Sequence, residues 1–141
     1  MAITWLQAKE KNGIASFYNT NITLNTIASI PFEYAYRCQV GITDDKNIVI
    51  EPLTKDIVLS GKLDEYNLLK ISIKPTYSRI ASTLLMTKIS EILGLELSDR
   101  AIKFETIWNE EENHLIIKTN REEKKWLELY YLLYLYFYLL F

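Results

Sequence analysis

Basic side chains gather along one short part of the chain, between residues 70 and 88. They are Lys70, Lys74, Arg79 and Lys88. Cations on one face can meet the phosphates of a nucleic acid, and an arginine can also donate two hydrogen bonds to the edge of a guanine. We therefore expect a DNA-binding surface here. The alternative is that these are ordinary solvated charges on the edges of strands and a helix.

No residues with the spacing of a catalytic or metal site accompany these cations. The single histidine, His114, has no cysteine or carboxylate at ligand spacing, so neither a zinc site nor a histidine-based triad is expected. The acidic residues at 44–45 and 110–112 fall in predicted turns and do not match a calcium loop. The four glycines are too scattered for a phosphate-binding loop. The sequence thus predicts no catalytic residue, no metal and no cofactor.

The composition is that of one globular domain. The chain has 141 residues, 49% of them hydrophobic and 24% charged, with a net charge of −2. Because the whole protein does not attract phosphate, a nucleic-acid contact needs a local basic patch. The one cysteine, Cys38, is expected to pack as a small apolar side chain. The first residues lack the pattern of a secretory signal, which favours a cytoplasmic protein.

The second half of the chain has a clear order of elements. Residues 68–74 alternate and predict a strand, PTYS predicts a turn, and RIAST predicts a short extended piece. A helix follows, with Ser82 or Thr83 at its start and Gly94 at its end. Its apolar face consists of Leu85, Ile89, Ile92 and Leu93. AIKFETIW and HLIIKT then predict a hairpin that closes around NEEEN.

The first half repeats this order in a shorter form. FYNTNITLN predicts a strand, a short helical turn begins at Pro31, and CQVGIT and IVIEPL predict a hairpin around DDKN. The tripeptide IAS at residues 27–29 recurs at residues 80–82, 53 positions later. We therefore predict a duplication within domain 1–120, with repeats at 14–53 and 69–119. Two such small β-rich units can bury together the faces that neither can bury alone.

These segments resemble a known family. NITLNTIASIP is similar to the start of MraZ proteins, and KISEILGLELSDRAIKFETIWNEEENHLIIKT resembles the helix, connector and terminal hairpin of the AbrB/MraZ swapped-hairpin superfamily. The resemblance covers residues 14–119. It implies a small swapped-hairpin barrel made of two intertwined units, and transcriptional regulation through DNA binding.

The resemblance also points to individual residues near the second loop. Arg79 stands where the family carries an arginine, while Thr76 and Ser78 replace its usual aspartate and glycine. The first copy has Asn25 near the acidic position and Thr26 or Ile27 in place of the arginine. The DNA-facing chemistry is therefore half missing, and the fold can persist while the function drifts. The DNA-binding residues predicted are Lys74, Thr76, Ser78, Arg79 and Lys88.

The end of the chain is apolar on every side. Residues 126–141 carry one charge, Glu128, and follow the charged boundary REEKK within segment 121–141. A helix is expected, because leucine and tyrosine dominate and neither glycine nor proline interrupts them. Three interpretations stay open: a helix buried in a subunit interface, a short membrane anchor with Lys124 and Lys125 at the head groups, or a translated extension outside the fold.

Together these patterns predict an α+β protein. Its core is built from duplicated strand-helix-hairpin units, and an apolar C-terminal helix follows. The leading functional hypothesis is a non-enzymatic, DNA-binding transcriptional regulator that acts as an oligomer, with self-association through the C-terminal apolar segment. The alternative is a protein-interaction module of the same fold, antitoxin-like or an assembly protein. Membrane association is a further, weaker expectation, and an enzyme is the least favoured class.

Overall fold

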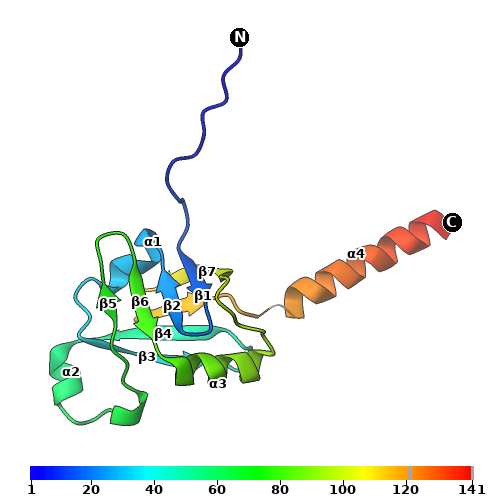
Figure 1. The fold of residues 1–141 in the computed structure, drawn as a ribbon. Helices are drawn as coiled ribbons and strands as arrows, with labels where there is room; N and C mark the ends of the chain where they lie inside the picture. The colour runs from blue at the N-terminus through cyan, green and yellow to red at the C-terminus, as the bar shows by residue number, and fades with distance from the viewer. Residues whose placement is uncertain (121, 141) are drawn as a thin grey trace.

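The protein is an α+β fold built on one antiparallel sheet of eight strands (Figure 1). The computed structural model describes residues 1–120 and 122–140, and within the last helix the side chains of 128–140. The strands are β1 (Ile14–Phe17), β2 (Asn21–Leu24), β3 (Arg37–Ile42), β4 (Ile48–Leu53), β5 (Ser72–Ile73), β6 (Ser78–Ala81), β7 (Ile102–Asn109) and β8 (His114–Ile117). The helices are α1 (Thr26–Ser29), η1 (Ile30–Phe32), α2 (Lys55–Leu59), η2 (Glu65–Asn67), α3 (Thr83–Leu93) and α4 (Glu122–Leu140).

The sheet curls into a half-barrel. Its strand order is β3-β4-β8-β7-β1-β2-β6-β5, and every neighbouring pair is antiparallel. The curl brings β3, at one edge, up to the chain just before β5, at the other edge. There Cys38 and Leu69 exchange two backbone hydrogen bonds of 3.0 and 2.8 Å. This single bridge is the contact at which the two edges of the sheet meet.

Alternation along the strands directs one set of side chains into the curled sheet. β1, β2 and β6 each bury every second residue, as a strand with one wet face requires. The rings of Phe17 and Phe104 pack with their centroids 4.9 Å apart. The buried apolar residues of this core include Ala15, Phe17, Ile22, Leu24, Phe32, Cys38, Ile48, Ile50, Ile80, Met86, Leu115 and Ile117. Cys38 thus packs as an apolar side chain, as predicted.

The helices α1 and α3 begin at side-chain caps. Asn25 accepts a hydrogen bond from the backbone N–H of Ala28 at the start of α1, and Ser82 accepts one from Leu85 at the start of α3. α3 ends at Gly94, whose φ of 64° is the left-handed conformation that a side chain would disfavour. The predicted caps of this helix are therefore confirmed. Its buried face is formed by Met86 and Ile89, whereas Ile92, expected on that face, is 49% exposed.

The hairpins β1–β2 and β5–β6 share one geometry. Ser16 lies opposite Thr23 in the first, and Ser72 lies opposite Arg79 in the second. Both close through the same tight turn: the N–H of Tyr18 donates to the carbonyl of Asn21 at 2.9 Å, and that of Lys74 to the carbonyl of Tyr77 at 2.8 Å. Each pair of corresponding residues, such as Ser16 and Ser72, is separated by 56 positions. A helix and a second hairpin follow each of them.

The repeated tripeptide IAS does not mark equivalent places. In the first half, residues 27–29 lie in α1, because the Asn25 cap starts a helix directly before them. In the second half, Ile80 and Ala81 lie in β6, and Ser82 is the cap of α3. The 53-residue spacing of this tripeptide therefore differs from the 56-residue offset that the hairpin registers give.

Two expected elements differ in extent, and one helix was not expected. The strand expected over 68–74 is reduced to Ser72–Ile73 and the bridge at Leu69, because the chain first turns through η2. The single strand expected around 17–25 is two strands, β1 and β2, joined by the tight turn. The connection between the halves, for which no element was predicted, holds α2, near whose start the N–H of Ile57 donates a 3.5 Å hydrogen bond to the Thr54 hydroxyl.

The two ends of the chain extend from this body in different directions (Figure 1). Residues 1–12 form no regular element and expose Trp5 and Leu6. α4 is the helix that was expected at the C-terminal end, and each of its side chains from Glu128 to Leu140 is exposed. The charged boundary expected at 121–125, together with Trp126 and Phe141, lies outside the described side chains. Within the part of the chain described, no helix has the length and apolarity needed to cross a membrane.

Candidate nucleic-acid interface

Two of the predicted DNA-binding residues, Lys74 and Thr76, lie in the tight turn between β5 and β6. Both side chains are exposed. The turn is fixed from outside, because the Thr26 hydroxyl at the start of α1 donates a 2.8 Å hydrogen bond to the carbonyl of Thr76. The turn therefore exposes one cation, Lys74, and one hydroxyl, that of Thr76. Its backbone is held by β5 and β6 on either side and by the Thr26 hydroxyl.

Ser78 and Arg79 are neighbours on β6 and point to opposite faces of the sheet. Ser78 is fully buried among the core residues, so its side chain cannot contact DNA, and the prediction for this residue is corrected. Its hydroxyl has no hydrogen-bond partner within the described residues. Arg79 is exposed on the outer face, where its guanidinium lies 5.2 Å from the centre of the Tyr77 ring.

Arg79 belongs to a row of polar residues that crosses five strands. The strand registers place Ser72 opposite Arg79, Arg79 opposite Thr23, Thr23 opposite Ser16, and Ser16 opposite Lys103. All five lie on the outer face, since their neighbours along β6, β2 and β1 are buried. We call this set the outer polar row. It holds two cations and three hydroxyls and no carboxylate.

Ser16, Thr23 and Lys103 were not expected at this surface. Alternation within each short strand indicates which residues lie on an outer face. However, Lys103 joins the row only because β1 pairs with β7, and it lies 87 positions after Ser16 in the chain. Non-local register of this kind leaves no local trace in a sequence. In contrast, Lys88 lies outside the row, on the exposed side of α3, opposite the buried Met86.

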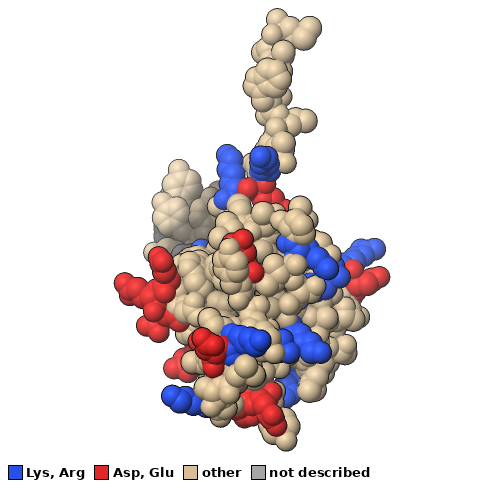
Figure 2. Space-filling model, turned by 90° about the vertical axis from the view of Figure 1, so that its left-hand side faces the viewer, with Lys and Arg blue, Asp and Glu red and all other residues tan. Residues whose placement is uncertain are grey.

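The charges around this region are mixed. Figure 2, which views the molecule from the β5 and α2 side, shows Lys and Arg interspersed with Asp and Glu and no continuous positive area. On the outer face, Glu105 lies two residues from Lys103 and pairs with Lys118 at 3.9 Å. Long-range attraction to phosphate is therefore weak, and any nucleic-acid contact depends on the row itself.

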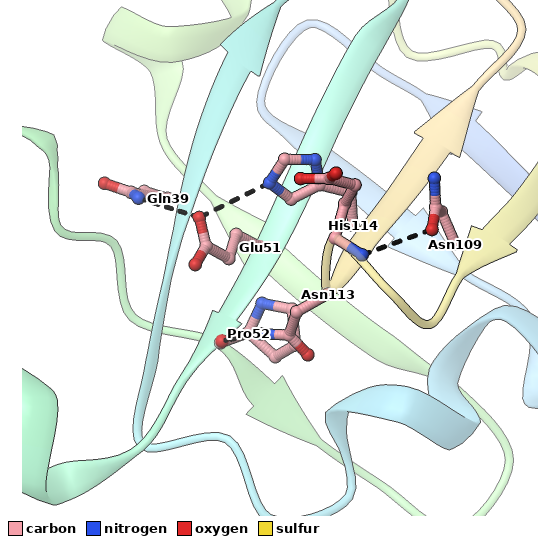
Figure 3. A network of polar contacts seen from close by, with 7 residues as sticks. Gln39, Glu51, Pro52, Asn109, Asn113 and His114 are labelled. Carbon is pink, nitrogen blue, oxygen red and sulfur yellow. Dashed lines mark hydrogen bonds and ion pairs between the residues drawn. The ribbon is translucent and has the colours of Figure 1, made fainter.

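A second polar group lies on the outer face of β3, β4 and β8 (Figure 3). The Glu51 carboxylate accepts a 3.0 Å hydrogen bond from the Gln39 amide and lies 3.6 Å from Nε2 of His114. This carboxylate beside the histidine was not expected, because the two residues are joined only by the pairing of β4 with β8. The group borders an open depression of about 420 Å³ that also contains Val49 and Asn67.

This second group has the geometry of a structural contact. His114 and Glu51 are each about a third exposed, and their attraction requires a protonated imidazole. Among the side chains that the structure describes, no three histidine, cysteine, aspartate or glutamate residues come together as metal ligands. Burial raises the pKa of the Cys38 thiol to about 12, which keeps it protonated and unreactive at neutral pH.

No family model, curated protein or solved structure matches this chain. The functional assignment therefore rests on the chain's own residues, above all on the outer polar row.

Proposed function

We propose that this protein is a non-enzymatic, DNA-binding transcriptional regulator that works as an oligomer in the cytoplasm. The observation that carries the proposal is the outer polar row, which lines up Arg79, Thr23, Ser16 and Lys103 across adjacent strands without an acidic residue among them. Arginine and lysine supply charge for phosphates, and the Ser16 hydroxyl between them can donate to a phosphate or a base edge. The Thr23 hydroxyl already donates a 2.7 Å hydrogen bond to the Asn21 amide oxygen, so it can accept from a base edge.

The dimensions of the row fit a DNA groove. Neighbouring strands lie about 4.8 Å apart, so three intervals between Arg79 and Lys103 amount to about 14 Å along the sheet. The major groove is about 12 Å wide. The two cations can therefore face phosphates on opposite walls of the groove, with Thr23 and Ser16 over the base edges between them. The exposed turn at Lys74 extends the same edge of the sheet.

The duplication is part of this proposal. The matching hairpins β1–β2 and β5–β6, with their common turn and constant offset, support two copies of one unit. The sheet order supports an intertwined arrangement, because hairpin β3–β4 pairs with β8 of the other half, and hairpin β1–β2 pairs with β6 and β7. We regard these as the two swapped units of the small barrel that the AbrB/MraZ resemblance implies.

Oligomerisation compensates for the small size of one row. Two cations give a weak site, and several such sites on one assembly act together on a single DNA molecule. The exposed α4 is the segment that would bring the copies together, since its apolar side chains are not covered by the body of the protein. Self-association through α4 is thus the second component of the proposed function.

Binding to labelled DNA at several salt concentrations tests the proposal. We expect Arg79→Ala to weaken specific binding by about 1–3 kcal/mol, the usual size of a lost arginine–base contact. Lys103→Ala and Lys74→Ala should weaken all sequences alike and lower the slope of log affinity against log salt by about 1 each. Lys62→Ala, which removes the same charge from the loop after α2, is the control and should change neither quantity.

A protein-interaction module is the second candidate. The mixed charges of the view in Figure 2 and the open depression beside Gln39, Val49 and Glu51 favour it. Along β3, residues that hydrogen-bond to β4 alternate with residues whose backbone groups face the free edge. Val40 and Ile42 belong to the second set, so the free edge of β3 borders that depression. Absence of measurable DNA affinity at low salt would reject the first candidate and leave this one.

A further inference from the structure

The apolar C-terminal helix separates its leucines from its aromatic residues. With 3.6 residues per turn, Leu129, Leu132, Leu133, Leu139 and Leu140 share one side, at positions i, i+3, i+4, i+10 and i+11. Tyr136 takes the remaining place on that side, and Leu135 borders it. The opposite side carries Tyr130, Tyr131, Tyr134, Phe137 and Tyr138, at i, i+1, i+4, i+7 and i+8. We call these sides the leucine face and the tyrosine face.

Both faces are uncovered in the single chain. Among the large apolar side chains from residue 129 to 140, exposure runs from 36% at Leu135 to 83% at Leu139. Soluble proteins do not leave a contiguous apolar surface of this kind in water. A cover must therefore come from outside the body of the protein, toward which α4 does not fold (Figure 1).

The two faces differ in what can cover them. A leucine has no polar atom and packs between the side chains of a neighbouring helix, as in helix pairs with apolar residues spaced by three and four. A tyrosine covers apolar area with its ring while keeping its hydroxyl in water. The tyrosine face can therefore form the wet side of an assembly, and the leucine face its dry interior.

We propose that α4 pairs with α4 of a second copy through the leucine face, with the tyrosine face turned outward. The second copy is the partner that fits, because residues 129–140 contain no charge and so require an equally uncharged, leucine-lined surface. The pairing segment is about 18 Å long, which is shorter than the roughly 30 Å of a bilayer core. The inference rests on the self-association part of the proposed function and does not depend on DNA binding.

Two matched double variants test the pairing in the full chain. Leu132→Asn with Leu139→Asn changes the leucine face, and Tyr134→Asn with Tyr138→Asn makes the same change on the opposite face. Sedimentation equilibrium should give a mass of at least twice 16.6 kDa for the parent protein and for the tyrosine variant. The leucine variant should sediment near 16.6 kDa, with its dissociation constant raised about 100-fold or more.

Two results would overturn the proposal. The first is a monomeric parent protein, and flotation of that monomer with phosphatidylcholine–phosphatidylglycerol vesicles would identify lipid as the cover instead. The second is a tyrosine variant that dissociates while the leucine variant does not. Protection of the Cys38 thiol from a colorimetric reagent confirms in each variant that the core is folded. DNA affinity is measured on the same samples. Loss of DNA binding in every protein, with the masses as expected, would reject the regulator and leave the pairing intact.

Discussion

The buried hydroxyl of Ser78 offers a sharp test of the core. Ser78 lies on β6 with no exposed surface, and within the described residues its Oγ has no hydrogen-bond partner. A buried polar atom left unpaired costs about 1–3 kcal/mol of folding free energy. Replacing it by alanine removes that cost and loses only the packing of one oxygen atom. We therefore expect Ser78→Ala to stabilise the protein by about 1 kcal/mol, or about 3–5 °C in Tm.

Ser29→Ala is the matched control for this measurement. Ser29 is also buried, but its hydroxyl donates a 3.2 Å hydrogen bond to the carbonyl of Leu24. The same atomic change should therefore destabilise the protein by about 0.5–1.5 kcal/mol. Urea unfolding followed by tryptophan fluorescence gives both values. A Ser78→Ala protein that is destabilised by 1 kcal/mol or more would refute the reasoning, because it would show that the hydroxyl is paired.

Three further predictions concern the packing of the same domain. Gly13→Ala should destabilise the domain by about 1–3 kcal/mol, because the new Cβ would lie under 3.0 Å from the Thr106 hydroxyl. A thermal melt should show that adding Thr106→Ala recovers part of this loss. Thr119→Val should cost about 1–3 kcal/mol in urea unfolding, since it leaves the N–H of Ile48 and the carbonyl of Lys46 without their bonds of 3.0 and 2.8 Å. Cys38 should resist thiol reagents until the protein unfolds. Its pKa is about 12 in the folded protein against 9.0 in the unfolded chain, so only the unfolded chain loses this proton between pH 9 and 12, and the free energy of unfolding falls over that range.

Elements with local signals could be predicted from the sequence. The helix α3 has a serine cap, a glycine stop and helical spacing between them, and each was found where expected. The hairpins β3–β4 and β7–β8 have alternating strands with polar turns between them. The shortened strand β5 could not be predicted, because the chain before it bends into η2 and meets the sheet only at Leu69.

The candidate site was only partly predictable for a similar reason. Arg79 was identified from its resemblance to a family position, and its exposure on β6 agrees with a surface role. Ser78, one residue earlier, was assigned to the same surface, although alternation along a strand sends neighbours to opposite faces. Lys103 was not predicted, because β2 and β1, from the other end of the domain, lie between its strand and the strand of Arg79.

The outer polar row draws its residues from both halves of the chain. Ser72, Arg79 and Lys103 come from the second half, while Thr23 and Ser16 come from the first. If the hairpins are copies, their common offset makes Ser16 the counterpart of Ser72 and Thr23 the counterpart of Arg79. On that basis, Thr23 rather than Thr26 or Ile27 would stand at the position of the family's arginine. One arginine then remains where a symmetric unit would carry two. Under the proposed function, a single chain therefore offers only a weak electrostatic contact, and joining chains through α4 would raise the number of cations available to DNA.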